Sequence, residues 1–135
     1  MEDPFGRGVV AAAAALGFLM SASCGTNDPP VAFVDFVVAV TDETFVLRAS
    51  DPETIAAAYE NLRGGNGRFP IGPLRQGDGG FNAPWSWHID PDEARLTEVA
   101  IEVCDGRPSY VEEHIEDFLS IGYCPWGGRI VGVRP

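Results

Sequence analysis

Hydrophobic positions along the chain change their spacing several times, and each change predicts a different element. The segment 31–40 is an almost continuous run of β-branched, aromatic and other apolar residues, which is typical of a buried strand. The segment 44–48 has the same character and follows the polar residues Asp42 and Glu43. We therefore expect the two segments to form a hairpin.

A helix is predicted to begin within residues 50–53, where Ser50 as the capping residue, an early proline and a glutamate three positions after the serine form a typical start signal. Apolar residues then recur at helical spacing and give this helix one apolar face. That face is made by Ile55, Ala58, Tyr59 and Leu62. Gly64 and Gly65 are expected to end the helix, because glycine is common just past a helix C-terminus.

The middle of the chain predicts shorter strands. Prolines interrupt the segment 69–75, so any strand there is expected at a sheet edge, where proline's missing N–H group does no harm. The alternating segments 85–89 and 96–104 flank the polar turn 90–94 and are predicted to form a second hairpin. Its apolar face is expected to form the core through Trp85, Trp87, Ile89, Val99, Ile101 and Val103.

The last third of the chain predicts one more helix and a final strand. The helix is expected to begin at Pro108, with Val111, Ile115 and Phe118 on one stripe. The segment 129–133 is predicted to be a strand. The order of all these elements predicts an α+β fold, in which a mostly antiparallel sheet carries two helices packed on one face.

The N-terminal segment has the pattern of an export signal. An unbroken apolar run of about 13 residues from Gly8 to Met20 fits the core of a signal peptide and is too short for a membrane-spanning helix. We therefore expect residues 1–23 to be a signal peptide and residues 24–30 to be a short tether. Residues 31–135 are then long enough for a single small domain.

Three cysteines in an exported chain predict one disulfide and one cysteine with a different role. Cys24 lies shortly after the apolar run, where a bacterial lipoprotein carries its acylated cysteine, so Cys104 and Cys124 are expected to pair. Ser21 and Ser23 also have the spacing that an ordinary signal peptidase accepts, so free secretion is the alternative to lipidation. A pair of metal-binding thiolates is the alternative to the disulfide.

The charge balance limits the classes of partner. The net charge is -11, with 20 acidic residues against 9 basic ones. Such a surface repels phosphate backbones and anionic lipid heads, so we expect no nucleic-acid binding and no membrane contact other than a lipid anchor at Cys24. Cations and basic proteins are the partners that the net charge favours, although acidic composition by itself serves solubility.

Four sequence blocks occur together in the second half of the chain. They are Asn82-x-x-Trp85-Ser86-Trp87-His88, Glu98-Val99-Ala100-Ile101-Glu102-Val103-Cys104-Asp105, Tyr110-Val111-Glu112-x-His114 and Cys124-Pro125-Trp126. In this combination the chain resembles an uncharacterised family of small exported domains that share these blocks. The resemblance implies a shared fold with paired cysteines and implies no reaction.

The only two histidines suggest a site for a divalent metal. His88 is expected opposite Glu98 in the predicted second hairpin, and Asp90, Glu102 and Asp105 are further candidate ligands. His114 is expected on the other side of the sheet, so the two histidines are not expected to share a site. The structural alternative is a cross-strand pair between His88 and a carboxylate.

The sequence does not support a hydrolytic enzyme. Ser86 and His88 share a strand face, but two strand residues separate them by roughly 7 Å, which is too far for a nucleophile and its base. No other serine has the sequence context of a nucleophile elbow.

An aromatic set predicts a ligand-binding surface, because flat rings beside hydrogen-bonding groups suit sugars and peptides. The candidate binding residues are Phe81, Asn82, Trp85, Tyr123 and Trp126. Core packing is the alternative role for these rings. The leading hypothesis is an exported, lipid-tethered, non-enzymatic domain without a cofactor that binds an extracellular protein, glycan or cation. The alternative is a metal-binding protein or metal-dependent hydrolase built on His88.

Overall fold

The structure, a computed structural model, describes residues 32–135. The predicted signal peptide, the predicted tether and the proposed lipidation site Cys24 lie outside these residues. Within residues 32–135 no helix has both the length and the apolar character needed to cross a membrane.

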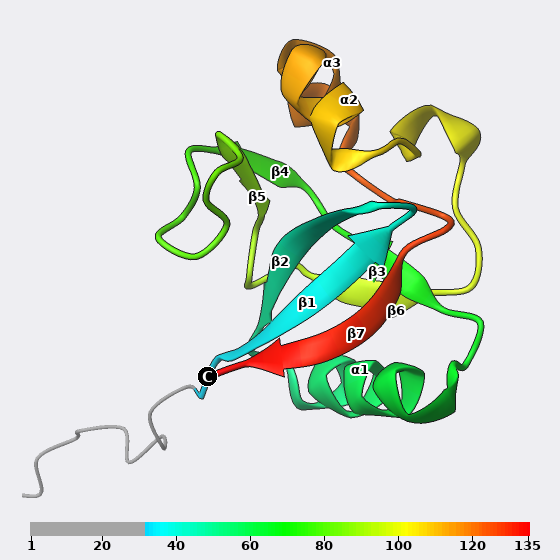
Figure 1. The fold of residues 1–135 in the computed structure, drawn as a ribbon. Coiled ribbons are helices and arrows are strands. Elements are labelled where there is room, and N and C mark those ends of the chain that lie inside the picture. The colour runs from blue at the N-terminus through cyan, green and yellow to red at the C-terminus, as the bar shows by residue number, and fades with distance from the viewer. Residues whose placement is uncertain (1–31) are drawn as a thin grey trace, which may run out of the picture.

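The central sheet has three antiparallel strands in the order β2-β1-β7. Strands β1 (Val34–Val40) and β2 (Glu43–Ala49) form the predicted first hairpin, and β7 (Arg129–Arg134) pairs with the other edge of β1. The first and last strands of the domain therefore lie side by side (Figure 1). This pairing closes the domain by joining residues nearly a hundred positions apart.

Helix α1 (Pro52–Gly64) begins where the sequence predicted, but a different residue caps it. Asp51 is the N-cap: its Oδ2 atom accepts hydrogen bonds from the backbone N–H of Thr54 at 2.9 Å and from the Thr54 hydroxyl at 2.8 Å. These hydrogen bonds hold the pKa of Asp51 below its ordinary value. The predicted capping role of Ser50 is wrong, because the serine lies one position too early to reach the first free N–H groups of the helix.

The core lies on one face of the central sheet. The buried residues of β1, Phe36, Val38 and Val40, alternate with partly exposed ones, as expected for a strand with a single buried face. The predicted apolar face of α1 packs against them. Ala58 is fully buried, and the rings of Tyr59 and Phe36 meet edge to face with 5.2 Å between their centroids. Figure 1 shows α1 along one side of the sheet and the other helices at the opposite end.

The predicted second hairpin is wrong. Strand β5 (Trp87–Ile89) pairs with β4 (Leu74–Gln76), and β6 (Arg95–Thr97) pairs with β3 (Phe69–Ile71). All three sheets are antiparallel, but β5 and β6 belong to different ones. Gly72, between β3 and β4, forms an antiparallel bridge with Tyr123 instead of continuing either strand, so β3 and β4 take different partners.

The strand predicted for 96–104 also ends early. After β6 the chain leaves the sheet and finishes in a single 3-10 turn, η1 (Glu102–Cys104). The side chains of Val99, Ile101 and Val103 are 82%, 66% and 61% exposed, so the prediction that they form the core is wrong. Their alternation resembles a strand, but no neighbouring strand among residues 32–135 supplies hydrogen-bonding partners.

The last helical region is divided into two helices, α2 (Pro108–Glu113) and α3 (Ile115–Ile121). His114 between them has φ -125° and ψ 35°, which is outside helical geometry. The predicted stripe nevertheless packs inward, with Val111 and Phe118 buried in the main core. The α+β class, with antiparallel pairing and one disulfide, is confirmed.

Candidate ligand-binding groove

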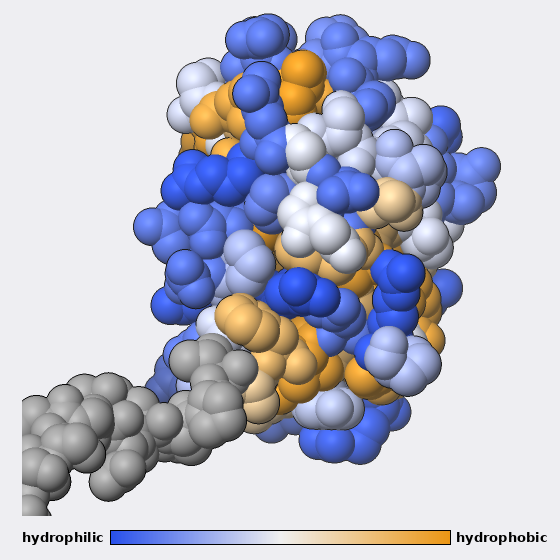
Figure 2. Space-filling view, turned by 90° about the vertical axis from the view of Figure 1, so that its left-hand side faces the viewer, coloured by the Kyte–Doolittle hydropathy of each residue, from blue (hydrophilic) through white to orange (hydrophobic). Residues whose placement is uncertain are grey.

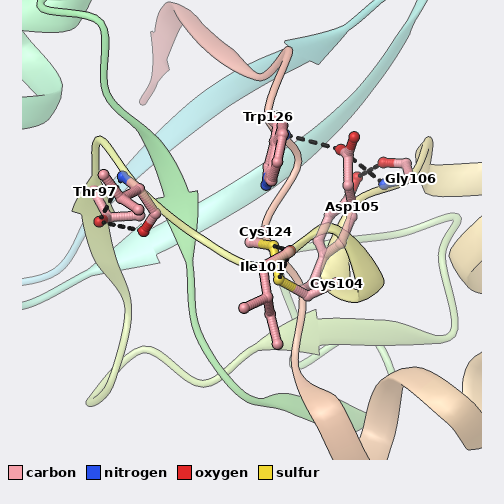
Figure 3. The surroundings of a disulfide bond; sticks show 9 residues. Thr97, Ile101, Cys104, Asp105, Gly106, Cys124 and Trp126 are labelled. Carbon is pink, nitrogen blue, oxygen red and sulfur yellow. Dashed lines mark hydrogen bonds between the residues drawn. A yellow bond between two sulfur atoms is a disulfide. The ribbon is translucent and has the colours of Figure 1, made fainter.

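A disulfide joins Cys104, at the end of η1, to Cys124, just after α3. The two Cα atoms lie 5.1 Å apart, and the Cys124 N–H also donates to the Cys104 carbonyl at 2.7 Å. Figure 3 shows this disulfide. Both cysteines are buried and pack with Phe69 in a second, smaller core. The predicted disulfide is confirmed, and it anchors the segment that follows Cys124.

That segment places Trp126 on a tight turn. The Gly128 N–H donates to the Pro125 carbonyl at 2.9 Å, which closes the turn. The Asp105 carboxylate accepts a second hydrogen bond at 2.9 Å from the backbone N–H of Trp126 (Figure 3). The disulfide and Asp105 thus hold the backbone of Trp126, while its side chain is 43% exposed.

Two adjoining depressions meet at Trp126. The larger has a volume of about 560 Å³ and is lined by the C-terminal end of α1, residues 64–68 and residues 126–131. The smaller has a volume of about 270 Å³ and is lined mainly by apolar residues, among them Phe69, Val99 and Ala100. Gly67 and Trp126 line both depressions, and we refer to the two together as the Trp126 groove.

Bare backbone forms much of the wall of the larger depression. A Cβ atom added at Gly64, Gly67 or Gly127 would meet no heavy atom within 4 Å, so the space beside these glycines is open. The carbonyls of Leu62 and Gly64 lie past the last helical hydrogen bond of α1 and accept none of the described hydrogen bonds. The groove therefore offers backbone acceptors to a ligand.

The charge of the larger depression differs from that of the whole chain. Two arginines and no acidic residue are among the described residues that line it. Arg68 is paired with Glu98 at 3.5 Å, whereas Arg129 is exposed and has no carboxylate within salt-bridge distance among residues 32–135. Arg129 is thus a cation available to a ligand in an otherwise acidic domain.

Most of the predicted binding residues do not reach this groove. Phe81 is 5% exposed, and Asn82 and Tyr123 are fully buried. Asn82 accepts a hydrogen bond from the Val46 N–H at 2.7 Å and donates one to the Trp87 carbonyl at 2.7 Å. Phe81 and Asn82 are therefore buried residues of this fold that lie outside the groove.

Tyr123 also has a structural position. Its ring packs at 5.3 Å from Trp87 between centroids, and its hydroxyl donates to the Gly106 carbonyl at 2.7 Å. Burial raises the pKa of Tyr123, and the carboxylates of Asp105 and Glu43 add to the effect. The phenol accordingly stays protonated and keeps this hydrogen bond throughout the physiological pH range.

Trp85 and Trp126 are the two predicted binding residues with accessible rings. The Trp85 indole N–H donates to the Thr44 carbonyl at 2.9 Å, and its ring stacks on Trp87 at 6.2 Å. These contacts hold Trp85 against the outer edge of β2.

On the face that Figure 2 shows, hydrophobic surface lies in separate patches divided by hydrophilic side chains. Of the predicted set, only Trp126 lines a depression.

The predicted metal ligands have separate partners. The His88 Nδ1 atom lies 2.8 Å from the Gly77 carbonyl, Asp90 pairs with Arg75 at 3.0 Å, and Glu98 pairs with Arg68. Glu98 is not opposite His88, because β5 and β6 do not pair. The fourth candidate, Glu102, lies in η1. In the described part of the chain, no group of three or more His, Cys, Asp or Glu side chains is placed to hold a metal ion.

The remaining polar candidates also have structural contacts. The Ser86 hydroxyl donates to the Glu112 carboxylate at 2.7 Å rather than to His88. The His114 ring stacks on Tyr110 with 4.1 Å between centroids. Neither contact joins a serine hydroxyl to a histidine ring, which a nucleophile and its base would require.

Sequence reasoning does not identify the glycines and arginines of the groove. The sequence pattern indicates Gly64 and Gly65 only as a helix end, and Arg129 only as part of a strand. The sequence does contain one signal for the groove: Gly127 and Gly128 directly follow Trp126, two residues after Cys124.

Comparison with known proteins identifies a family. Residues 30–135 match the family model described as the BP-74 N-terminal domain, and this range includes every residue that the structure describes. No curated protein matched the chain significantly. No solved structure matched it significantly either. The matched range covers well over half of the chain, which therefore belongs to the BP-74 N-terminal domain family.

Proposed function

We propose that this protein is an exported, lipid-tethered, non-enzymatic binding domain that contacts its ligand at the Trp126 groove. One observation carries the proposal: an exposed tryptophan lies between two depressions on a turn that is held by a disulfide and by Asp105. A binding site gains affinity when its contact residues are held in place before the ligand arrives, because ordering them during binding costs free energy.

The exposure of Trp126 supports a role in recognition. Trp87 is fully buried and Trp85 is half-buried with its indole N–H bonded, so both contribute to folding. Trp126 leaves 43% of its surface in contact with solvent and has no such hydrogen bond from its ring among the described residues. Tryptophans with a large exposed surface are enriched where proteins bind their ligands and partners.

The cellular address rests on the leader and on the disulfide. The disulfide between Cys104 and Cys124 supports export, because such bonds persist in oxidising compartments and are rare in the cytosol. The apolar run before Cys24 supports a signal peptide, and the odd cysteine count supports lipidation of that residue. We expect the intact mass of protein from membrane fractions to show acyl groups on a chain that begins at Cys24. A soluble product that begins at or after Cys24 without acyl mass would contradict the tether.

Changing the groove is expected to weaken binding by about 10-fold or more without unfolding the domain. Gly127→Leu places a side chain in the open space beside Trp126, and Trp126→Ala removes the ring. Gly132→Leu is the matched control, because a Cβ there also meets nothing within 4 Å but Gly132 does not line the groove. Glycan and peptide arrays are probed with the wild type and the three variants. We expect both groove variants to lose about 10-fold or more in affinity, which corresponds to one lost contact of about 1.4 kcal/mol, and Gly132→Leu to bind like the wild type.

Thermal melting of the same variants controls for folding. All three substitutions change side chains at open positions, so we expect the melting temperatures to differ by only a few degrees. Equal array binding by all four proteins would place the ligand outside the groove. The absence of binding to every glycan and peptide on the arrays would contradict the proposed function itself.

A further inference from the structure

We propose that the ligand of the Trp126 groove is a glycan that carries an acidic sugar. This inference rests on the proposed function and adds the chemical class of the ligand. Three properties of the groove carry it: unpaired backbone acceptors, one available arginine and an exposed indole ring. Each property selects for a different feature of the ligand.

The backbone acceptors require a ligand with hydrogen-bond donors. The carbonyls of Leu62 and Gly64 lie at the C-terminal end of α1, where the helix dipole adds negative potential. A ligand made only of carboxylates or phosphates would be repelled at this wall. Sugar hydroxyl groups both donate and accept hydrogen bonds, so they match the exposed carbonyls.

Arg129 requires an acidic group at a second position. Arg129 lines the same depression, and its guanidinium lacks a carboxylate partner among residues 32–135. Guanidinium binds a carboxylate through two parallel hydrogen bonds, which gives orientation as well as affinity. A sugar acid offers the carboxylate and the hydroxyl donors on one ring.

Trp126 supplies a flat surface for the ring of the sugar. A pyranose has a face of C–H groups and a rim of hydroxyl groups, so it can pack on an indole while the rim reaches polar atoms of the walls. Gly67 and Gly127 leave space on the walls next to this ring. The groove can therefore hold a sugar without any movement of the backbone.

A bound peptide strand is disfavoured, because the outer edge of β7 is already blocked. The Ile130 N–H points away from β1 and donates to the Asn61 side chain at 2.8 Å. The register then shifts at Val131, so that Val37 pairs with Gly132 and Val38 with Ile130. A peptide in the groove would find a bulged edge whose donor is occupied, so it could not extend the sheet.

The net charge of the chain makes the expected binding specific. A surface with a net charge of -11 does not collect anions in general, and its long-range repulsion is screened beyond about 8 Å at physiological ionic strength. An acidic sugar is thus held through its contact with Arg129 rather than through the overall field. Short glycans are expected to bind better than long polyanions.

The test compares three short probes by calorimetric titration: trigalacturonate, its neutral counterpart galactotriose, and triglutamate. The wild-type domain is expected to bind trigalacturonate at least about 10-fold more tightly than either of the others, which corresponds to one charge-assisted hydrogen-bonded contact. Arg129→Ala is expected to remove this preference. Arg63→Ala is the matched control, because Arg63 is also exposed without a carboxylate partner in the described chain but does not line the groove.

The outcomes separate this inference from the proposed function. Equal binding of the neutral and acidic sugars, stronger binding of triglutamate, no binding of trigalacturonate, or equal losses in the Arg129 and Arg63 variants would each overturn the acidic glycan. In the first two cases, loss of that binding in Trp126→Ala would leave the groove as the binding site. Unchanged binding in Trp126→Ala would overturn both proposals.

Discussion

Replacing Cys104 and Cys124 together by alanine is expected to lower the free energy of unfolding by about 3 kcal/mol, since the bond restricts a loop of 20 residues in the unfolded chain. The loop contains α2 and α3, whose Val111 and Phe118 lie in the main core. Denaturant unfolding followed by tryptophan fluorescence measures the change.

Reduction provides the internal control for this prediction. A reductant is expected to destabilise the wild-type domain by a similar amount and to leave the double alanine variant unchanged. A loss below about 1 kcal/mol in the variant, together with no effect of reductant on the wild type, would show that the two thiols are not bonded. That result would also remove the structural support for export.

Asn82→Ala is expected to lower the free energy of unfolding by about 3 kcal/mol, because it leaves two buried backbone groups without a partner. The Asn82 side chain joins the outer edge of β2 to β5, through the Val46 N–H and the Trp87 carbonyl. Its side chain is fully buried, so water cannot replace either hydrogen bond without opening the structure. The same unfolding measurement tests this expectation.

Ser86→Ala is the matched control for Asn82→Ala. Ser86 lies in the same loop and also bonds a distant residue, Glu112, but this contact is exposed. We expect its loss to cost below about 1 kcal/mol, because water replaces an exposed hydrogen bond. Equal effects of the two substitutions would contradict the assignment of Asn82 as the residue that closes the edge of β2.

The parts of the fold that the sequence predicts correctly are those that local patterns determine. The first hairpin follows from two apolar runs separated by a short polar break, and α1 follows from its start signal and the apolar spacing of residues such as Ala58 and Tyr59. The disulfide follows from cysteine number. The hairpin and the helix depend on local patterns alone. The disulfide depends in addition on which two of the three cysteines pair.

The errors arise where distant partners decide the structure. Val99, Ile101 and Val103 alternate like a strand, but their exposure depends on the absence of a neighbouring strand within residues 32–135, which alternation cannot reveal. Asn82 resembles a surface residue of a glycine-rich loop, and only the folded edge of β2 gives it a buried role.

The groove is beyond local reasoning for the same reason. Its walls come from residues 61–69, 98–100 and 126–131, three segments that meet only after folding. Sequence analysis identifies Trp126 as a candidate because of its residue type, but it places Tyr123 and Asn82 in the same surface. Aromatic composition does not distinguish a ring in the core from a ring in a groove.

The most direct test of the account is an NMR titration of the isotope-labelled domain with trigalacturonate, in which each tryptophan contributes one indole N–H signal. The account predicts saturable shifts of the Trp126 indole signal and of the Gly127 and Arg129 amides, while the Trp85 and Trp87 indole signals stay in place. The largest shifts at Trp85, or saturable shifts elsewhere in the domain with none at Trp126, would contradict the assignment of the Trp126 groove as the site where this domain binds its ligand. No saturable shift at any residue would overturn the acidic glycan as that ligand.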